Sequence, residues 1–374
     1  MGVDGTADST PIGPCPACGL ARLEPRHVTS DGTAVAIDVC PVCEGAFFDA
    51  GELDAVRSDD APLEALFGLP RIPRVPRLCP RGHGPMEERR PQVAGITCTA
   101  DVCRTCHGVF LDGRERRLLA KGSLPPSPPI GQVVARRSVL WILQLLVHLP
   151  VEVRNPTRGR AWVVLSLVVS SLALFVARIE GVDLGHLALD PAAFHTPSPP
   201  LPTLVTYALV HGSWWHVLGN VYFLYTFGDN VEHVFGSRLF ALFAVLVTAA
   251  GAVAFLATEP ADGARLVGAS GLVAGILAAY LWTFPRNRLF HVVLFVQFEL
   301  PAWIYVALWA TFQVGMAFAA SEGSLAGADA DVAWSVHVGS FVAGLVLTPL
   351  AHLRVRHRLA RAAAGAATPS PTAR

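Results

Sequence analysis

Six apolar runs of about 20 residues, separated by more polar loops, dominate the chain from residue 161 onward. An α-helix needs about 20 apolar residues to cross the hydrocarbon core of a bilayer. The pattern therefore predicts six membrane-spanning helices and an all-α polytopic membrane fold. Their expected positions are 161–179, 205–228, 238–258, 266–284, 300–320 and 333–353.

The chain before residue 161 has no apolar run long enough to span a bilayer. Residues 13–119 lack long apolar runs, and 122–130 are proline-rich, as in a semi-rigid linker. Residues 138–151 are apolar but too short to span a bilayer, so they are predicted to lie at its interface. The tail after Arg361 is rich in Ala, Pro, Ser and Thr and is predicted to be disordered. The predicted domains are two small modules at 13–57 and 77–119, a linker and interfacial segment at 122–160, a membrane domain at 161–355 and a tail at 362–374.

Composition agrees with a membrane protein. The chain is 52% hydrophobic with a mean hydropathy of +0.45, which is too apolar for an ordinary soluble protein. Its formal net charge is zero, so global charge says nothing about partners. The polar residues before Pro14 lack an apolar core, so no signal peptide is expected there.

The charges of the loops predict an orientation. Cytosolic loops carry an excess of Lys and Arg. Arginines lie before the first span and after the second, fourth and sixth, whereas acidic residues gather in the other loops. We therefore expect both termini in the cytosol, in a bacterial inner or plasma membrane. The arginines are Arg154, Arg158, Arg160, Arg238, Arg286, Arg288, Arg354, Arg356 and Arg358, and the acidic residues are Glu180, Asp183, Asp190, Glu259, Asp262, Glu322, Asp329 and Asp331.

The soluble region contains a repeat built on cysteine. All eight cysteines lie within the first 106 residues. Each copy has two knuckles about 20 residues apart, followed by a Gly-x-Phe-x-Asp pattern, and two such knuckles are typical of a structural zinc site. A module this small buries little core, so metal binding would supply its folding energy. The predicted ligands are Cys15, Cys18, Cys40 and Cys43 in the first copy, and Cys79, His83, Cys103 and Cys106 in the second.

Two alternatives stay open for the cysteines. Cys98 aligns with Val35 of the first copy, which favours a packing role, but it could replace His83 as a ligand. All the cysteines could also be unliganded core residues.

The repeats resemble the zinc-ribbon family related to transcription factor IIB over residues 15–53 and 79–115. The resemblance implies a small structural metal module that contacts protein or nucleic acid. No dense basic patch with interleaved aromatic residues is visible, so a protein partner is favoured over nucleic acid.

Polar residues within the predicted membrane spans indicate a candidate catalytic site. Ser270 stands between Ala269 and Gly271 in the fourth predicted span, and His337 lies in the sixth. Polar or ionisable groups are costly inside a membrane and mark functional sites. A serine hydroxyl needs an adjacent base to act as a nucleophile. Small residues flank both positions and favour close helix approach, although Ser270 alone could simply serve helix packing.

The remaining polar residues complete this hypothesis. No acidic residue lies at the depth of His337 within a span, so the sequence predicts a Ser–His dyad without a third member. His216 and Asn220, four residues apart on one helix face, could donate to an oxyanion together with the Ser270 backbone N–H. His211, beside Trp214 and Trp215, is instead expected to anchor the helix at the interface.

These motifs resemble the rhomboid family of intramembrane serine proteases. The matching patterns are His-x4-His-x3-Asn, Gly-x-Ser-Gly, His-x-Gly-x4-Gly and the turn Gly228-x3-Glu232-x3-Gly236, across residues 160–355. The resemblance implies a six-helix bundle with a water-filled cavity open to the outside. It implies Ser270 as nucleophile, His337 as general base, and His216 and Asn220 in the oxyanion hole.

The resemblance also implies partners and shows two departures. The implied substrates are transmembrane proteins, cut near the outer end of a helix after a small residue, with no cofactor needed for the chemistry. The loop 198–206 lacks the Trp-Arg pair that members often carry. Ser340 stands where a second glycine is usual.

Two other functions compete with the protease. One is a non-catalytic rhomboid-like binder that escorts membrane proteins, although an idle site has no need of all four polar residues. The other is a membrane-tethered regulator whose zinc module contacts the transcription machinery. This second role is compatible with proteolysis.

Overall fold

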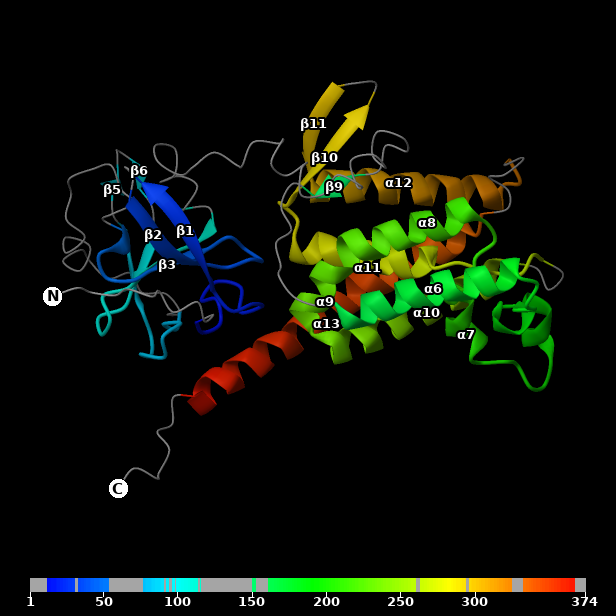
Figure 1. Cartoon of the computed structure of the whole chain (residues 1–374), viewed down its shortest axis with the longest axis horizontal. Coiled ribbons are helices and arrows are strands. Elements are labelled where there is room, and N and C mark those ends of the chain that lie inside the picture. The colour runs from blue at the N-terminus through cyan, green and yellow to red at the C-terminus, as the bar shows by residue number, and fades with distance from the viewer. Residues whose placement is uncertain are drawn as a thin grey trace. The chain divides into compact units, whose positions relative to one another are not determined.

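The computed structural model divides the chain into two compact units (Figure 1). One comprises 1–133 with 353–374, and the other comprises 134–352. We call them the zinc unit and the membrane unit. The structure describes residues 12–30, 33–53, 77–90, 92–93, 96–97, 99–113, 115, 150–152, 161–259, 263–293, 296–324 and 332–366. The predicted linker at 122–130, nearly all of the interfacial segment, the tail beyond residue 366 and Cys98 lie outside these residues.

The two cysteine repeats of the zinc unit pair into one antiparallel sheet of six strands. Their order in the sheet is β1-β2-β3-β8-β7-β4, so the central pair joins β3 of the first copy to β8 of the second. A hairpin of β5 and β6 follows β4 in the chain. The strands are β1 (Glu24–Ser30), β2 (Thr33–Val39), β3 (Ala46–Phe48), β4 (Glu87–Arg89), β5 (Gln92–Val93), β6 (Ile96–Thr97), β7 (Ala100–Val102) and β8 (Val109–Leu111).

Two phenylalanines at the centre of this sheet lock the copies together. Phe47 and Phe110 are directly paired across β3 and β8, and both are fully buried. Each ring lies over the glycine of the other copy. A Cβ at Gly45 would lie 2.6 Å from the Phe110 ring, and one at Gly108 would lie 2.2 Å from the Phe47 ring. The two repeats therefore share a single core.

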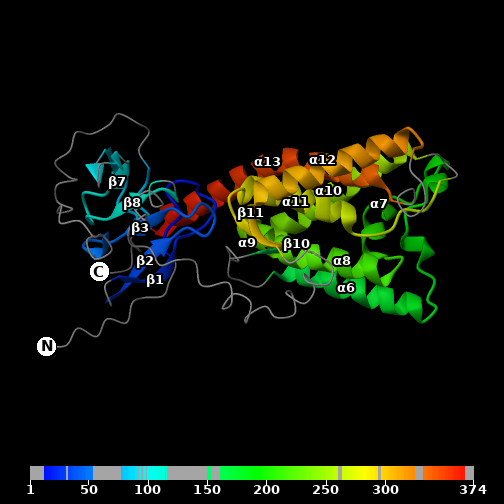
Figure 2. The ribbon, with the colours of Figure 1, turned by 90° about the horizontal axis from the view of Figure 1, so that it is seen from above.

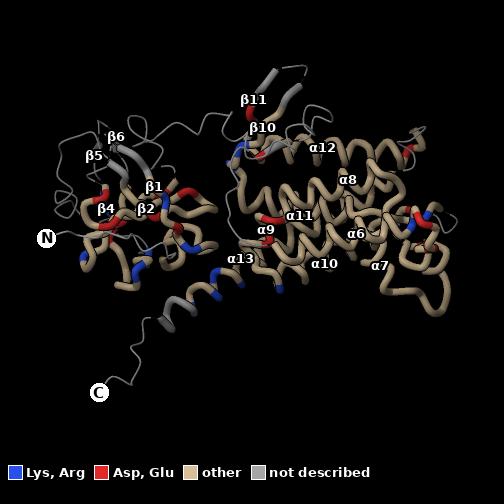
Figure 3. Tube along the Cα trace, viewed as in Figure 1, with Lys and Arg blue, Asp and Glu red and all other residues tan. Residues whose placement is uncertain are grey.

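The membrane unit is built mainly from helices, which Figure 2 draws as coiled ribbons. Among the described residues, four helices are long and apolar enough to cross a membrane, at Trp162–Ile179, Ser237–Thr258, Ala302–Ser321 and Trp334–Arg361. Their charged residues gather near the helix ends, and the long helices are otherwise almost free of charge (Figure 3). The α-helices are α6 (Trp162–Ile179), α7 (Thr203–Thr206), α8 (Trp214–Phe223), α9 (Asp229–Phe235), α10 (Ser237–Thr258), α11 (Ser270–Thr283), α12 (Ala302–Ser321) and α13 (Trp334–Ala366).

The helices follow the predicted spans, with differences at two of them. The second predicted span begins with short turns, and regular helix starts only at Trp214, continuing through a π-helical segment at Leu224–Gly228 into α9. The fourth span is the 14-residue helix α11, shorter than the expected 266–284. The unit also contains a small sheet of β9 (Val151–Glu152), β10 (Arg288–Val293) and β11 (Val296–Pro301). The six-helix count remains a prediction.

Small residues bring α11 and α13 into close contact. A Cβ on Gly344 of α13 would lie 2.5 Å from the carbonyl oxygen of Gly275, and one on Gly271 would lie 2.6 Å from a Val336 methyl group. Ser340 is buried in this interface, and its hydroxyl donates to the Val247 carbonyl at 2.9 Å. Its polar group is thus satisfied where glycine was expected, and the close approach of the helices is preserved.

Two carboxylates anchor one end of the membrane unit. Glu232 accepts hydrogen bonds from the N–H groups of Val163 and Val164, so it caps the start of α6. Buried Glu152 on β9 accepts from Asn230 at 2.9 Å and from the Tyr280 hydroxyl. Each carboxylate satisfies buried donors from other elements, and Glu152 thereby connects β9 to α11, the helix that carries Ser270.

Candidate active site and metal sites

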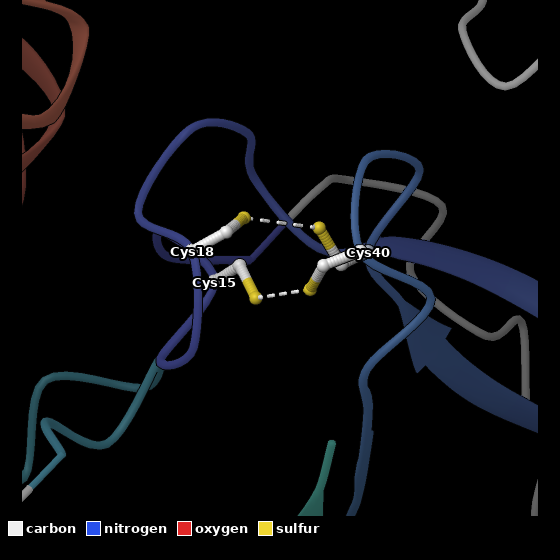
Figure 4. A group of neighbouring side chains, drawn as sticks. Cys15, Cys18 and Cys40 are labelled. Atoms are coloured by element: carbon white, nitrogen blue, oxygen red, sulfur yellow. Dashed lines mark hydrogen bonds between the residues drawn. The ribbon is translucent and has the colours of Figure 1, made fainter. Parts of the chain in front are cut away.

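The first cysteine cluster has the shape of a tetrahedral metal site (Figure 4). The Sγ atoms of Cys15 and Cys43 lie 3.5 Å apart, and those of Cys18 and Cys40 lie 3.6 Å apart. A zinc ion with sulfur ligands at about 2.3 Å gives tetrahedron edges of about 3.8 Å, whereas a disulfide requires about 2.05 Å. The spacing therefore fits zinc and excludes a disulfide between these pairs.

The second cluster repeats the arrangement with a histidine. The Cys79 Sγ lies 3.8 Å from the Cys106 Sγ and 3.7 Å from His83 Nδ1, and the Cys103 Sγ lies 3.9 Å from His83 Nδ1. In each of the two clusters, all four ligand atoms lie within 4.8 Å of one another. Burial raises the pKa of the Cys79 thiol to about 12. The thiol therefore loses its proton at neutral pH only when the positive charge of a bound metal ion stabilises the thiolate. The two clusters fit two structural zinc sites.

Salt bridges connect the first knuckle of the second repeat to the first repeat. Arg81, which lies between Cys79 and His83, contacts Asp49 and reaches Asp38 at 3.5 Å. Arg77 makes the equivalent pair within its own copy, with Asp101 at 2.6 Å. These ion pairs add to the shared phenylalanine core in holding both clusters on one sheet.

The candidate nucleophile lies at the start of a helix inside the membrane unit. Ser270 is the first residue of α11, not five residues into a helix as the sequence predicted. The reason is Gly268, whose φ of +111° is incompatible with a helix and whose N–H donates to the Tyr207 carbonyl at 2.9 Å. The Ser270 N–H is therefore among the first N–H groups of α11, which have no intrahelical acceptor.

The structure brings Ser270 and His337 together. His337 lies on α13, and its Nε2 is 2.8 Å from the Ser270 Oγ. The other ring nitrogen, Nδ1, lies 2.6 Å from the Oε1 of Gln313 on α12. The Trp334 ring meets the imidazole edge to face, with ring centroids 5.8 Å apart. The histidine is thus fixed on two sides and directed at the serine.

His216 and Asn220 lie one turn apart on α8. His216 is close to the loop before Ser270, because a Cβ at Gly268 would lie 2.3 Å from its Nε2. Asn220 is 7% exposed, and among the described residues no group accepts a hydrogen bond from its Nδ2. A buried amide donor without an acceptor is unusual and is the arrangement expected where a ligand oxygen would bind.

Two residues have roles that sequence reasoning missed. His211, expected to anchor the helix at the interface, is instead fully buried, and its Nε2 accepts from the Ala269 N–H at 3.4 Å. Gln313 was not singled out at all. Its signal in the sequence was an amide in the middle of an apolar span, but the search for a third member considered only acidic residues.

Comparisons with known families agree with this architecture. Residues 200–354 match the model of the Rhomboid domain, and residues 14–58 match the model of the Transcription factor zinc-finger family. A comparison with curated proteins finds no match. The predicted architecture is confirmed: the chain combines a Rhomboid domain with an N-terminal zinc ribbon. With its four long apolar helices, it is an integral membrane protein that carries the domain of rhomboid proteases and pseudoproteases.

Proposed function

We propose that this protein is an active intramembrane serine endopeptidase that cuts transmembrane proteins. The observation that carries the proposal is the 2.8 Å contact between His337 Nε2 and Ser270 Oγ. A nucleophile and base within hydrogen-bond reach, held on separate helices by close packing, is the arrangement that nucleophilic catalysis requires. A pseudoprotease has no need to keep both groups in contact.

The proposed chemistry uses four residues. His337 Nε2 takes the proton of the Ser270 hydroxyl as the oxygen attacks the scissile carbonyl, and the resulting imidazolium then protonates the leaving amine. Water hydrolyses the acyl-enzyme in the second half of the reaction. Asn220 and His216, with the Ser270 backbone N–H, stabilise the negative charge on the carbonyl oxygen. The positive end of α11 adds to this stabilisation.

The orientation in the membrane is part of the proposal. Arg238 lies at the start of α10, and Glu259 follows its end. By the positive-inside rule the end of α10 is external, so the loop before Ser270 faces the outside and both termini are cytosolic. In this orientation the dyad cuts substrates near the outer end of their helices, in a bacterial inner or plasma membrane.

The zinc unit is proposed to contact a cytosolic protein. Three arginines beside the second cluster are all engaged with carboxylates of the same unit, namely Arg77, Arg81 and Arg104. This pairing lowers their availability for phosphate groups and disfavours nucleic acid. Zinc-dependent binding of the full-length protein to duplex DNA or RNA, weakening as the salt concentration rises, would contradict this choice.

The experiment that tests the protease is cleavage of a model transmembrane substrate by the purified full-length protein in liposomes. We expect cleavage by the wild type, and a loss of at least about 10³-fold in Ser270→Ala and His337→Ala. Ser166→Ala, which changes an exposed serine on α6 whose hydroxyl donates to the Trp162 carbonyl, is the matched control and should retain activity. Cleavage that survives in Ser270→Ala would overturn the proposed site. A folded wild type without cleavage on several substrates would favour the non-catalytic binder.

A further inference from the structure

Helix α12 carries one buried amide among apolar side chains. Gln313 is 6% exposed, although nearly all of α12 faces away from the protein interior. Its neighbours Phe312 and Val314 are both exposed, as expected of residues that face lipid. An amide held inside a membrane protein is costly unless it is hydrogen-bonded, and such groups mark functional positions.

The partner of this amide is the histidine of the dyad. The Gln313 Oε1 lies 2.6 Å from His337 Nδ1. An amide oxygen can only accept a hydrogen bond, so Nδ1 must carry the imidazole proton. Nε2 is then the unprotonated nitrogen, and it is this nitrogen that lies 2.8 Å from the Ser270 Oγ. The amide therefore selects the tautomer in which His337 can act as a base.

We propose that Gln313 is a positioning residue that completes a Gln313–His337–Ser270 relay. This inference rests on the proposed function and adds a third member that the sequence did not predict. The amide fixes the ring orientation and the tautomer. When His337 takes the serine proton, the Nδ1–H···Oε1 hydrogen bond becomes charge-assisted and stronger. A neutral amide supplies these effects without a second charge buried in the membrane.

Substitutions at one position separate this role from a structural one. Gln313→Met keeps the size of the side chain and removes the acceptor. Gln313→Asn keeps an amide but is one methylene shorter, so its oxygen cannot reach His337 without a shift. Gln313→Glu keeps oxygen acceptors at the original reach. Thr311→Val, which changes an exposed polar residue on the same helix, is the matched control.

The primary readout is the rate at which a fluorophosphonate labels Ser270 in the full-length protein in liposomes. This reagent forms a bond between phosphorus and the serine oxygen and releases fluoride, so its rate reports serine activation independently of how a protein substrate docks. Substrate kcat, substrate KM and the unfolding temperature are measured in parallel.

We expect Gln313→Met and Gln313→Asn to lower the labelling rate and kcat by about 10- to 100-fold, because a buried donor loses its acceptor and the base tautomer loses its preference. KM and the unfolding temperature should change little. Gln313→Glu should label at least about threefold faster than Gln313→Met, and Thr311→Val should match the wild type.

Other outcomes overturn the inference in distinguishable ways. Normal labelling in Gln313→Met, with the wild type active, would overturn the positioning role and leave the dyad intact. Slower labelling in Gln313→Glu than in Gln313→Met would mean that the amide donates to Nδ1, which also contradicts the proposal. A wild type that neither labels nor cleaves would overturn this inference and the proposed function together.

Discussion

The zinc unit and the membrane unit bring their reactive groups together by opposite means. In the zinc unit each knuckle supplies two ligands within a few residues of each other, and two knuckles about 20 residues apart form each cluster. In the membrane unit Ser270 and His337 are 67 residues apart, on different helices. A bound metal ion can bring the zinc ligands together, whereas the packing of α11 against α13 brings Ser270 and His337 together.

This difference predicts that the two units respond differently to the loss of a single side chain. Zinc binding supplies the free energy that folds the zinc unit, so its folded state depends on the four ligand side chains of each cluster. The membrane unit is stabilised by its apolar helices and their many contacts, so losing one polar side chain should abolish chemistry while leaving the fold intact. Each of the following experiments affects one unit and spares the other.

The largest expected effect comes from removing zinc. Zinc binding contributes about 10–16 kcal/mol in small zinc-finger peptides, so a strong chelator or Cys40→Ser should unfold the zinc unit. Because Phe47 and Phe110 form a common core, loss of the first cluster should also disturb the second copy. Hydrogen exchange by mass spectrometry would detect this loss across residues 12–53 and 77–113. Preserved protection in the second copy of Cys40→Ser would show that the repeats fold independently.

The converse change affects the membrane unit alone. Gly268→Ala would place a Cβ 2.3 Å from His216 Nε2 and would strain a φ of +111°. We expect at least about a 100-fold loss of substrate cleavage, because displaced catalytic groups lose their alignment, with no change in bound zinc. Gly212→Ala is the matched control, since a Cβ there meets nothing within 4 Å. Equal activity in the two variants would contradict the close approach of His216 to the nucleophile loop.

A smaller effect distinguishes the ligands of the second cluster. We expect His83→Ala to lower the zinc content of the full-length protein from about two ions to about one, because three thiolates bind zinc less tightly than a complete set of four ligands. Cys98→Ser should retain both ions. The metal content after dialysis, measured by mass spectrometry, decides the matter, and the reverse result would make Cys98 the ligand.

The smallest effect concerns a buried carboxyl group of the zinc unit. Burial raises the pKa of Glu115 to about 7, against an ordinary value near 4.5. The folded state therefore binds more protons than the unfolded state between these values, and this contribution to stability is lost as the pH rises through about 7. Glu115→Gln should remove this contribution. The difference in unfolding free energy between wild type and variant, measured at saturating zinc from pH 5 to 8, would then vary with pH. A flat difference would contradict the shift.

How far the sequence could predict each unit follows from the same contrast. The zinc ligands and the apolar spans are local patterns, so the spacing of cysteines and the length of apolar runs predicted both. The pairing of β3 with β8 was not predicted, because nothing local indicates that two similar modules share one sheet. The reciprocal contacts of Gly45 and Gly108 with the opposite phenylalanine rings explain it, together with the ion pair between Arg81 and Asp49.

For the candidate site too, local sequence patterns predict the residues but not how distant segments come together. Motifs identified Ser270, His337, His216 and Asn220, but their geometry depends on contacts between distant segments. The position of Ser270 at the helix start follows from the left-handed conformation of Gly268, which the sequence pattern of an apolar run does not reveal. Gln313 escaped notice because a lone amide carries no charge, and its importance lies entirely in its contact with a histidine on another helix.

The most direct test of the account is the rate of fluorophosphonate labelling at Ser270 in the full-length protein in liposomes, with His337→Ala beside the wild type. The account predicts rapid labelling of the wild type at Ser270, identified by peptide mass spectrometry, and loss of that labelling in His337→Ala. Labelling at another serine, or equal labelling of Ser270 in both proteins, would contradict the claim that His337 activates Ser270.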